Sequence, residues 1–255
     1  MIETLERIAR AAGKLALSHA RRRDFSVEAK GPLDLVTLAD RAVESLLVDA
    51  LSEAFPADGI LGEEGTTLRP GARRQWIIDP IDGTFNFVRG LPDWAVSVGL
   101  IEDGKPRAGA VYAPVRDRLL IGGRDEAARV NGTILPPAAP LDPVTGVISL
   151  GFATTTPIGR EVAVISGILG SLAMGYRHGG STAVALMQLA EGQIDAMLGL
   201  GNKAWDIAGG IGAIAGLGYS STVDFTAQPH GAPIDFIIGK PDVVARGSAL
   251  LRPAA

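Results

Sequence analysis

The sequence predicts a mixed α/β fold in two halves, and three observations carry this prediction. Up to Pro56 the apolar side chains recur with helical spacing, and from Ile60 onward they gather into short runs typical of strands. Beyond a proline-dense stretch at 136–143, helical patterns alternate with strand patterns. Such alternation is typical of α/β proteins, whereas the consecutive strands before it indicate an α+β half.

Two amphipathic helices are predicted before Pro56. Apolar residues at three- and four-residue steps predict the first helix over residues 2–20 and the second around residues 43–51. Gly31-Pro32 breaks the chain between them. The first helix carries acidic residues and lacks the cationic face of a membrane-surface helix, so we expect it to cover a core.

Five short strands are predicted next, with Asp103-Gly104 as a hairpin signal between two of them. They cover residues 60–61, 76–78, 95–101, 107–112 and 118–121. The proline-dense stretch is the expected junction between an N-terminal half, residues 1–140, and a C-terminal half, residues 141–255. In the second half we expect helices near 161–174, 182–191 and 206–217, and strands near 194–198 and 234–238.

Composition excludes several classes of function. The chain has 255 residues, 47% of them hydrophobic, so it can bury a large core. Its net charge of −4, from 24 basic and 28 acidic residues, offers no basic footprint, and we expect no nucleic-acid partner. With 0 cysteines it has no disulfide, thiolate nucleophile or Cys-type metal site.

No membrane association or export is expected either. The longest uncharged stretches, such as residues 207–223, are too short to span a bilayer, and this one is broken by glycines. The N-terminus carries Glu3 and Glu6 and has no continuous apolar core, unlike a secretory signal. A cytoplasmic location is therefore the default expectation.

Acidic residues follow two apolar strands at the point where each strand ends. Glu63 and Glu64 come directly after the strand at 60–61, and Asp79 and Asp82 follow the strand at 76–78. Bare carboxylates at such positions would be costly, so the pattern indicates a bound cation. Magnesium prefers hard oxygen ligands and keeps waters for a substrate, which suits this set better than zinc does.

The turn after Asp82 adds a second feature. Gly83 permits a tight turn, and exposed amides at Gly83 and Thr84 could bind a phosphate oxygen. A purely structural turn with a capping role explains the same three residues equally well. The motif alone leaves both interpretations open.

Four segments together resemble one enzyme family. They are Gly62-Glu63-Glu64, residues 76–84 (WIIDPIDGT), residues 204–206 (AWD) before a glycine-rich helix, and residues 34–40 (DLVTLAD). This combination is similar to the inositol monophosphatase family of lithium-sensitive, magnesium-dependent sugar phosphatases, most clearly over residues 30–115 and 177–218. The resemblance implies a layered αβαβα sandwich and hydrolysis of a small phosphomonoester by water activated by two or three Mg²⁺ ions.

The resemblance also implies a role for particular residues. The implied metal ligands are Glu63, Asp79, the main-chain carbonyl of Ile81, Asp82 and Asp206. Thr84 and Glu63 would orient the attacking water, and Asp40 would assist its activation near a further metal. The implied phosphate cradle is Asp82, Gly83 and Thr84, and the segment lining the alcohol part of the substrate is Gly180, Ser181 and Thr182.

The chain departs from the family pattern on the substrate side. Many members carry a glutamate seven residues before the last metal aspartate, where this chain has Gly199, and Lys203 lies three residues before Asp206. We therefore expect no strong preference for inositol phosphates, and a shift toward inositol in Gly199→Glu if the pocket otherwise has the family's shape. The partner is expected to be a small phosphorylated substrate, in a protein that can form a homodimer.

Other functions stay open as alternatives. Related phosphatases act on histidinol phosphate, fructose 1,6-bisphosphate or 3′-phosphoadenosine 5′-phosphate, and a non-catalytic regulator could use the same fold. Arg177-His178-Gly179 resembles the start of a histidine phosphatase, but the remaining histidines, His19 and His230, lack matching context. Gly210-Ile211-Gly212 resembles a dinucleotide fingerprint, but it lies inside a helical pattern, which favours close helix packing instead.

Overall fold

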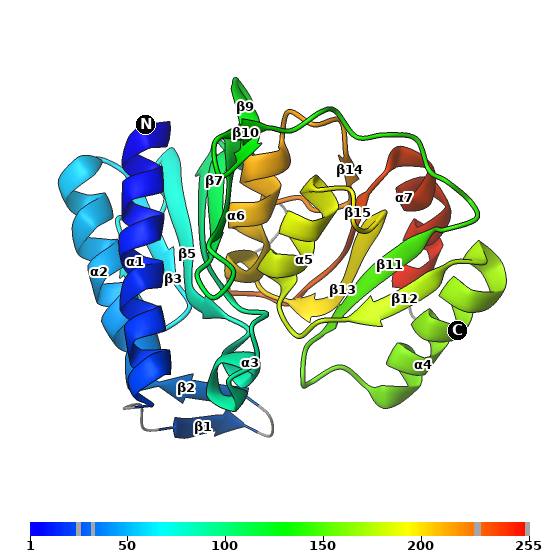
Figure 1. Cartoon of the computed structure of the whole chain (residues 1–255), viewed down its shortest axis with the longest axis horizontal. Helices are drawn as coiled ribbons and strands as arrows, with labels where there is room; N and C mark the ends of the chain where they lie inside the picture. The colour runs from blue at the N-terminus through cyan, green and yellow to red at the C-terminus, as the bar shows by residue number, and fades with distance from the viewer. Residues whose placement is uncertain (24–26, 32–33, 227–230, 253–255) are drawn as a thin grey trace.

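The computed structural model describes residues 1–23, 27–31, 34–226 and 231–252, so Pro32 and His230 lie outside the described residues. Figure 1 shows two long helices, a large sheet, two central helices, a smaller sheet and an outer group of helices, one layer after another. The predicted αβαβα sandwich is confirmed. Within the part of the chain that is described, no helix is long and apolar enough to cross a membrane.

Helices α1 (Ile2–Arg22) and α2 (Leu38–Ala54) form the first layer and pack on one face of the large sheet. α1 confirms the helix predicted over 2–20. α2 begins earlier than the predicted 43–51 pattern because Thr37 caps it. The Thr37 hydroxyl accepts from the Asp40 amide, and the Asp40 carboxylate accepts from the Thr37 amide, so the two residues form a capping box. A short hairpin of β1 (Val27–Gly31) and β2 (Asp34–Thr37) leads into α2.

The large sheet contains all five strands predicted before residue 122. Its neighbouring strands are antiparallel except β3 and β5, which run parallel. Asp103-Gly104 forms the predicted hairpin turn, with φ of 50° and 72°. In spatial order the strands are β10 (Thr133–Ile134), β9 (Glu126–Val130), β8 (Arg118–Gly123), β7 (Lys105–Ala113), β6 (Ala95–Glu102), β5 (Arg74–Asp82), β3 (Gly59–Gly62) and β4 (Thr67–Leu68).

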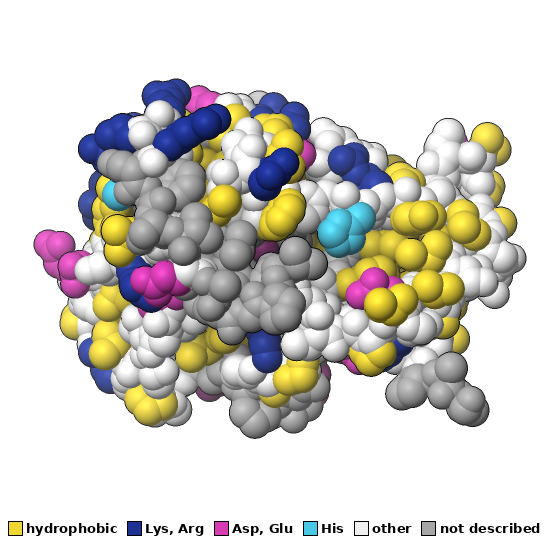
Figure 2. Space-filling view, turned by 90° about the horizontal axis from the view of Figure 1, so that it is seen from below, with side chains coloured by type: hydrophobic (Ala, Val, Ile, Leu, Met, Phe, Trp, Pro, Cys, Tyr) yellow, Lys and Arg dark blue, Asp and Glu magenta, His cyan; other side chains and the backbone are white. Residues whose placement is uncertain are grey.

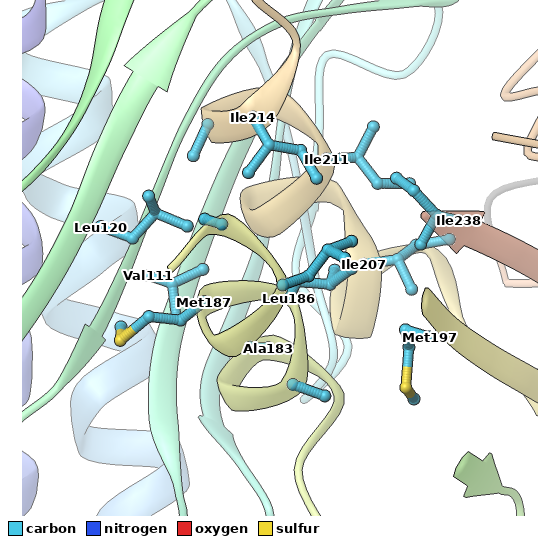
Figure 3. Packing of buried hydrophobic residues seen from close by; sticks show 14 of the residues in the cluster. Val111, Leu120, Ala183, Leu186, Met187, Met197, Ile207, Ile211, Ile214 and Ile238 are labelled. Atoms are coloured by element: carbon cyan, nitrogen blue, oxygen red, sulfur yellow. The ribbon is translucent and has the colours of Figure 1, made fainter. Parts of the chain in front are cut away.

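Helices α5 (Thr182–Ala190) and α6 (Ala204–Ile214) lie between the two sheets (Figure 1). α6 packs against β5, β6, β7 and β8. Figure 3 shows Ile207 and Ile211 of α6 together with Leu186 of α5 and Ile238 of the second sheet. This interlayer cluster is the largest buried apolar core, and it fixes the helix that carries Asp206.

The second sheet is covered on its outer side by further helices (Figure 1). Its strands, in order, are β12 (Gly175–His178), β11 (Val147–Phe152), β13 (Ala196–Asn202), β15 (Ile234–Gly239) and β14 (Ser220–Ser221). The outer helices are α4 (Ile158–Gly167) and α7 (Pro241–Gly247), with short helical segments at Ile168–Leu172 and Ser248–Leu251.

The chain crosses from the large sheet to the second sheet through residues 135–146. This crossing contains the proline-dense stretch, but α5 and α6, which follow it, pack between both sheets. The division into halves at residue 140 therefore stays a prediction.

Candidate active site

Asp79 and Asp82 lie at the carboxyl end of β5, and an irregularity in the strand brings them together. Residues three apart in a regular strand point to opposite faces of the sheet. Here the pairing of β5 with β6 shifts between Asp79, opposite Ser97, and Asp82, opposite Ala95. This bulge lets both carboxylates face one region, where they are 1% and 8% exposed.

Asp206 approaches the same region from the first turn of α6. Its Oδ2 accepts hydrogen bonds from the Lys203 amide at 2.8 Å and from Asn202 Nδ2 at 3.2 Å, which fixes the carboxylate at the start of the helix. One carboxylate oxygen from each of Asp79, Asp82 and Asp206 lies within 4.8 Å of the others. The structure thus joins residues separated by more than a hundred positions in the sequence.

Glu63 reaches this cluster from the turn after β3. Because β3 and β5 are parallel neighbours, their carboxyl ends meet, and the Glu63 amide donates to the Ile78 carbonyl at 3.3 Å. Glu63 and Asp79 share a side-chain hydrogen bond. The convergence expected from the spacing of the two acidic segments is therefore present.

Asp40, Ile81 and Thr84 meet beside these carboxylates. Thr84 Oγ1 lies 3.1 Å from the Ile81 carbonyl oxygen and 3.5 Å from Asp40 Oδ1. The other oxygen of Asp40 accepts from the Thr37 amide and hydroxyl at 2.8 and 2.6 Å. Asp40 therefore caps α2 with one oxygen and turns the other toward Thr84.

Gly83 forms the turn before α3 (Thr84–Arg89), with φ of 93°. A Cβ atom at this position would lie 3.0 Å from the Gly180 carbonyl oxygen and 3.1 Å from Ser181 Cβ. Both the positive φ and the close approach favour glycine here. The predicted phosphate cradle thus packs directly on the segment predicted to line the substrate.

Ser181 and Thr182 point into the site rather than out of it. The Ser181 hydroxyl donates to Asp82 Oδ2, and the Ala183 amide donates to the same oxygen at 2.7 Å. Thr182 Oγ1 accepts from Asn202 Nδ2 at 3.0 Å. Both side chains are buried, whereas Gly180 is exposed. Ser181 therefore holds Asp82 in place in this structure.

Two asparagines that the sequence did not single out connect the parts of the site. Asn86 Nδ2 donates to the Asp93 carbonyl at 2.6 Å and to the Gly179 carbonyl at 2.8 Å, so it ties α3 to the loop before α5. Asn202 bridges Thr182 and Asp206. Asn202 lies four residues after the strand predicted near 194–198 and one helical turn before Asp206, and this nearness to Asp206 was an available signal. Asn86 had none beyond its nearness to Thr84.

The electrostatics of the cluster favour a cation. Burial, and then the charges of Glu63, Asp82 and Asp206, hold the pKa of Asp79 well above its ordinary value. Burial and the charge of Asp206 raise the pKa of Asp82 to about 7, and burial raises the pKa of Asp206 to about 6. Burial also raises the pKa of Asp40 to about 6.

The donor set fits magnesium. Within the described ranges no lysine or arginine forms an ion pair with Asp79, Asp82 or Asp206. All the convergent ligand atoms are oxygens, and the buried carboxylates of Asp79 and Asp82 share one small region with the partly buried carboxylate of Asp206. Hard oxygen donors without a protein counter-ion suit Mg²⁺.

We expect the stabilisation by Mg²⁺ to grow with pH. Asp82, Asp206 and Asp40 have a higher pKa in the folded protein than in the unfolded chain, near 4. Their contribution to stability is therefore fully present below about pH 4 and is lost as the pH rises through about 6 to 7. Saturating Mg²⁺ should restore it, giving a larger rise in Tm at about pH 8 than at about pH 5.

Thermal unfolding with Mg²⁺, against Na⁺ at equal ionic strength, measures this difference. An equal rise in Tm at both pH values would contradict cation binding by these carboxylates.

Gly199 does not offer the substrate-side position expected from its offset. It lies buried in β13, and a Cβ there would meet the Phe236 ring at 2.2 Å and Asn202 Oδ1 at 2.4 Å. A glutamate could enter only by displacing the Phe236 ring. The condition for Gly199→Glu to shift the preference toward inositol is therefore not met, because this position faces packed side chains, and we expect the variant to destabilise the protein instead.

Lys203 and His178 also have defined surroundings. Lys203 Nζ donates to the Gly231 carbonyl at 2.8 Å, its charge acts against the rise in the pKa of Asp206, and its amide holds the Asp206 carboxylate. The His178 ring lies 6.3 Å from the Phe152 ring, in a tilted arrangement. This local packing favours the structural interpretation of Arg177-His178-Gly179 over a phosphorylated histidine.

Known proteins resemble this chain over nearly its whole length. The model of the inositol monophosphatase family matches residues 1–250. The Nus factor SuhB of Pasteurella multocida is 34% identical over 214 residues, which are 82% of this chain and 80% of that protein.

Solved structures agree with the sequence match. The extragenic suppressor protein suhB from Bartonella henselae has a TM-score of 0.87 at 27% identity, with 99% of this chain and 98% of that chain covered. The IMPase from Thermotoga maritima has a TM-score of 0.81 at 29% identity, with 96% and 94% covered. With its family match spanning the fold and the carboxylate cluster, this chain belongs to the inositol monophosphatase family.

Proposed function

We propose that this protein hydrolyses a small phosphomonoester, a sugar or polyol phosphate, with Mg²⁺ as cofactor. The observation that carries the proposal is the cluster of the Asp79, Asp82 and Asp206 carboxylates, two buried and one partly buried, which Glu63 joins. Membership of the inositol monophosphatase family supports it. Because the chain has no cysteine, a thiolate cannot be the nucleophile, and we take water as the nucleophile.

In this proposal five residues hold two or three Mg²⁺ ions. Bound Mg²⁺ neutralises phosphate charge and lowers the pKa of a bound water. The ligands are Glu63, Asp79, the Ile81 carbonyl, Asp82 and Asp206. Asp40 is connected to them by the Thr84 hydroxyl, which contacts both Asp40 and the Ile81 carbonyl.

The remaining residues bind and orient the reactants. Amides of Gly83 and Thr84 donate to phosphate oxygens, and Gly83 keeps the turn free of a side chain. The Thr84 hydroxyl and the Glu63 carboxylate orient the attacking water. Ser181 keeps Asp82 turned inward, and Gly180 to Thr182 line the space for the alcohol part of the substrate. Fixed polar groups of this kind stabilise developing charge without reorganising.

Release of inorganic phosphate from a panel of phosphomonoesters, with Mg²⁺ and with a chelator, tests the proposal. Hydrolysis of at least one small phosphomonoester that depends on Mg²⁺ is the expected result. The panel includes histidinol phosphate, fructose 1,6-bisphosphate and 3′-phosphoadenosine 5′-phosphate, the alternatives named from the sequence. Release that is absent throughout, or unaffected by the chelator, would overturn the proposal.

Inositol 1-phosphate is expected to be a substrate without being strongly preferred. The proposed substrate segment, Gly180 to Thr182, has no carboxylate to bind its hydroxyl groups, and a site without a buried hydrogen-bond partner discriminates weakly. We expect kcat/KM for inositol 1-phosphate within about tenfold of glycerol and nucleoside phosphates, a difference of about 1.4 kcal/mol. A preference of about a thousandfold, roughly 4 kcal/mol, would show that other residues supply specificity.

Lithium is expected to inhibit the enzyme at millimolar concentrations by competing with Mg²⁺. The all-oxygen ligand set suits a small hard cation, and the family resemblance supports this property. Initial rates with varied Li⁺ at several fixed Mg²⁺ concentrations measure the competition, with K⁺ as control. Insensitivity to Li⁺ would indicate a cluster that differs from that of the family.

A regulator on the same fold is the second candidate function. The relative from Pasteurella multocida is named a Nus factor, and this name leaves the expectation of no nucleic-acid partner without support. Exposed apolar side chains of α4 and β12 include Ile158, Val162 and Tyr176, and Figure 2 shows hydrophobic side chains gathered on the side where these elements lie. A homodimer and a cytoplasmic location also stay predictions.

A further inference from the structure

The buried face of helix α2 carries a carboxylate that the proposed chemistry does not use. Glu44 lies one turn after Asp40, within the stripe of α2 that faces the core, and is only 4% exposed. An apolar residue is expected at such a position, because an ionised carboxylate is costly to bury unless donors compensate it. The surroundings of Glu44 should therefore show what it does.

The donors to Glu44 all come from the turn between β3 and β4. Glu44 Oε2 accepts from the Glu64 amide at 2.8 Å, and Oε1 accepts from the Thr66 amide at 3.2 Å and the Thr66 hydroxyl at 2.6 Å. Three hydrogen bonds thus connect one carboxylate to the two sides of a five-residue turn, Gly62 to Thr66. Hydrogen bonds to a charged acceptor are stronger than those between neutral groups.

The same turn carries Glu63, between Gly62 and Glu64. Two backbone hydrogen bonds hold the turn together, one from the Gly62 amide to the Thr66 carbonyl and one from the Gly65 amide to the Gly62 carbonyl. A Cβ atom at Gly62 would lie 2.5 Å from the Glu44 carboxylate, so helix and turn are in direct contact. Glu44 therefore lies directly against the segment that presents Glu63 to Asp79.

We infer that Glu44 is a positioning residue, which holds the turn so that the Glu63 carboxylate faces Asp79. The inference rests on the proposed function, because it concerns how the chain presents a ligand to Mg²⁺. Glu44 touches neither the carboxylate cluster nor the substrate segment through any of its hydrogen bonds described here. Partners that orient metal ligands typically change metal affinity by about 10- to 100-fold when removed.

Glu44→Gln tests the inference with little change in shape. The glutamine amide group would face either the Glu64 or the Thr66 donors, so at least one buried amide loses its acceptor. We expect the Kd for Mg²⁺ alone, measured by titration calorimetry, to rise about tenfold. We also expect kcat to fall by a similar factor, with KM for the phosphomonoester nearly unchanged.

Thr66→Val separates positioning from charge. It removes the hydroxyl bond to Glu44 but keeps the charge of the helix and nearly the shape of the side chain. We expect a smaller rise in the Kd for Mg²⁺, about threefold. This variant also keeps the inference testable if Glu44→Gln fails to fold.

Asp58→Asn is the matched control. Asp58 is another buried carboxylate, 6% exposed, which binds Trp76 Nε1 at 2.9 Å at the opposite end of β3. Its replacement should lower Tm without changing the Kd for Mg²⁺. If Glu44→Gln and Thr66→Val likewise lower Tm and leave the Kd for Mg²⁺ unchanged, Glu44 is merely structural and the inference is overturned. If the unaltered protein fails to bind Mg²⁺, the proposed function falls and the inference falls with it.

Discussion

Replacing Asp79 by asparagine is expected to reduce kcat at saturating Mg²⁺ at least a hundredfold while the fold stays intact. Asp79 is 1% exposed, and its carboxylate is surrounded by those of Glu63, Asp82 and Asp206. Asparagine keeps the volume and the oxygen that accepts from the Ile81 amide at 2.9 Å, but it removes one negative charge from the cluster. A hundredfold loss corresponds to about 2.7 kcal/mol of transition-state stabilisation.

The same substitution should stabilise the protein when Mg²⁺ is absent. The raised pKa of Asp79 means that its ionisation at neutral pH costs free energy in the folded state. A neutral amide removes that cost, so Tm without Mg²⁺ should rise while the increase in Tm on adding Mg²⁺ becomes smaller. Loss of activity with gain of stability distinguishes a metal ligand from a residue that supports the fold.

Asp195→Asn is the control, because it should lower the stability and leave kcat nearly unchanged, the reverse of Asp79→Asn. Asp195 is also buried, but it pairs with Lys240 at 2.7 Å and accepts from the Val147 amide at 2.8 Å. Its replacement leaves a buried ammonium group without its charge partner and should cost about 1–3 kcal/mol of stability while kcat stays near that of the unaltered protein. Retention of more than about a tenth of the activity by Asp79→Asn would contradict the assignment of Asp79, because that loss is only about 1.4 kcal/mol.

The sequence predicted the acidic cluster because its members follow strand ends within short motifs. Glu63 and Asp79 could be paired from the apolar runs that precede them, and parallel pairing of β3 and β5 confirmed the pairing. The extent of β5 was underestimated. The strand continues through Pro80 to Asp82, where the bulge against β6 accommodates a residue that lacks an amide hydrogen.

Contacts between distant segments could not be predicted in this way. Asn86 binds the carbonyl of Gly179, and Ser181 binds Asp82, across 93 and 99 positions. Asn86 and Ser181 are residue types that commonly cap helices or lie at the surface. Only the packing of α3 against the loop before α5 therefore reveals their roles. The substrate-side expectation for Gly199 failed because the strand places a Cβ at this position against the ring of its cross-strand partner Phe236.

The glycines after Asp206 were predicted to serve helix packing, and the structure confirms this. A Cβ on Gly209 would lie 2.8 Å from the Val98 amide nitrogen, and one on Gly212 would lie 2.2 Å from the Ala108 carbonyl oxygen. The helix thus presents glycines to the large sheet, while Figure 3 shows its isoleucines on the side of α5 and the second sheet. Backbone contact between α6 and β7 leaves no space for a dinucleotide there.

Gly212→Ala is therefore expected to destabilise the protein severely. The added methyl group would meet the backbone of β7, which cannot move aside as a flexible side chain can. Overpacking of this kind costs about 3 kcal/mol or more, which for a chain of this size lowers Tm by roughly 6–12 °C. Because α6 begins with the turn that carries Asp206, the shift should also weaken Mg²⁺ binding in whatever fraction stays folded.

Gly159→Ala is expected to stabilise the protein, in contrast to Gly212→Ala. Gly159 lies in helix α4, and a Cβ there would meet no atom within 4 Å. Alanine loses less conformational entropy than glycine on folding, so this variant should gain about 0.5–1 kcal/mol. Thermal unfolding of both variants measures the contrast directly. A Tm for Gly212→Ala equal to that of Gly159→Ala would mean that α6 does not lie in backbone contact with the large sheet, and the geometry that brings Asp206 to Asp79 would lose its support.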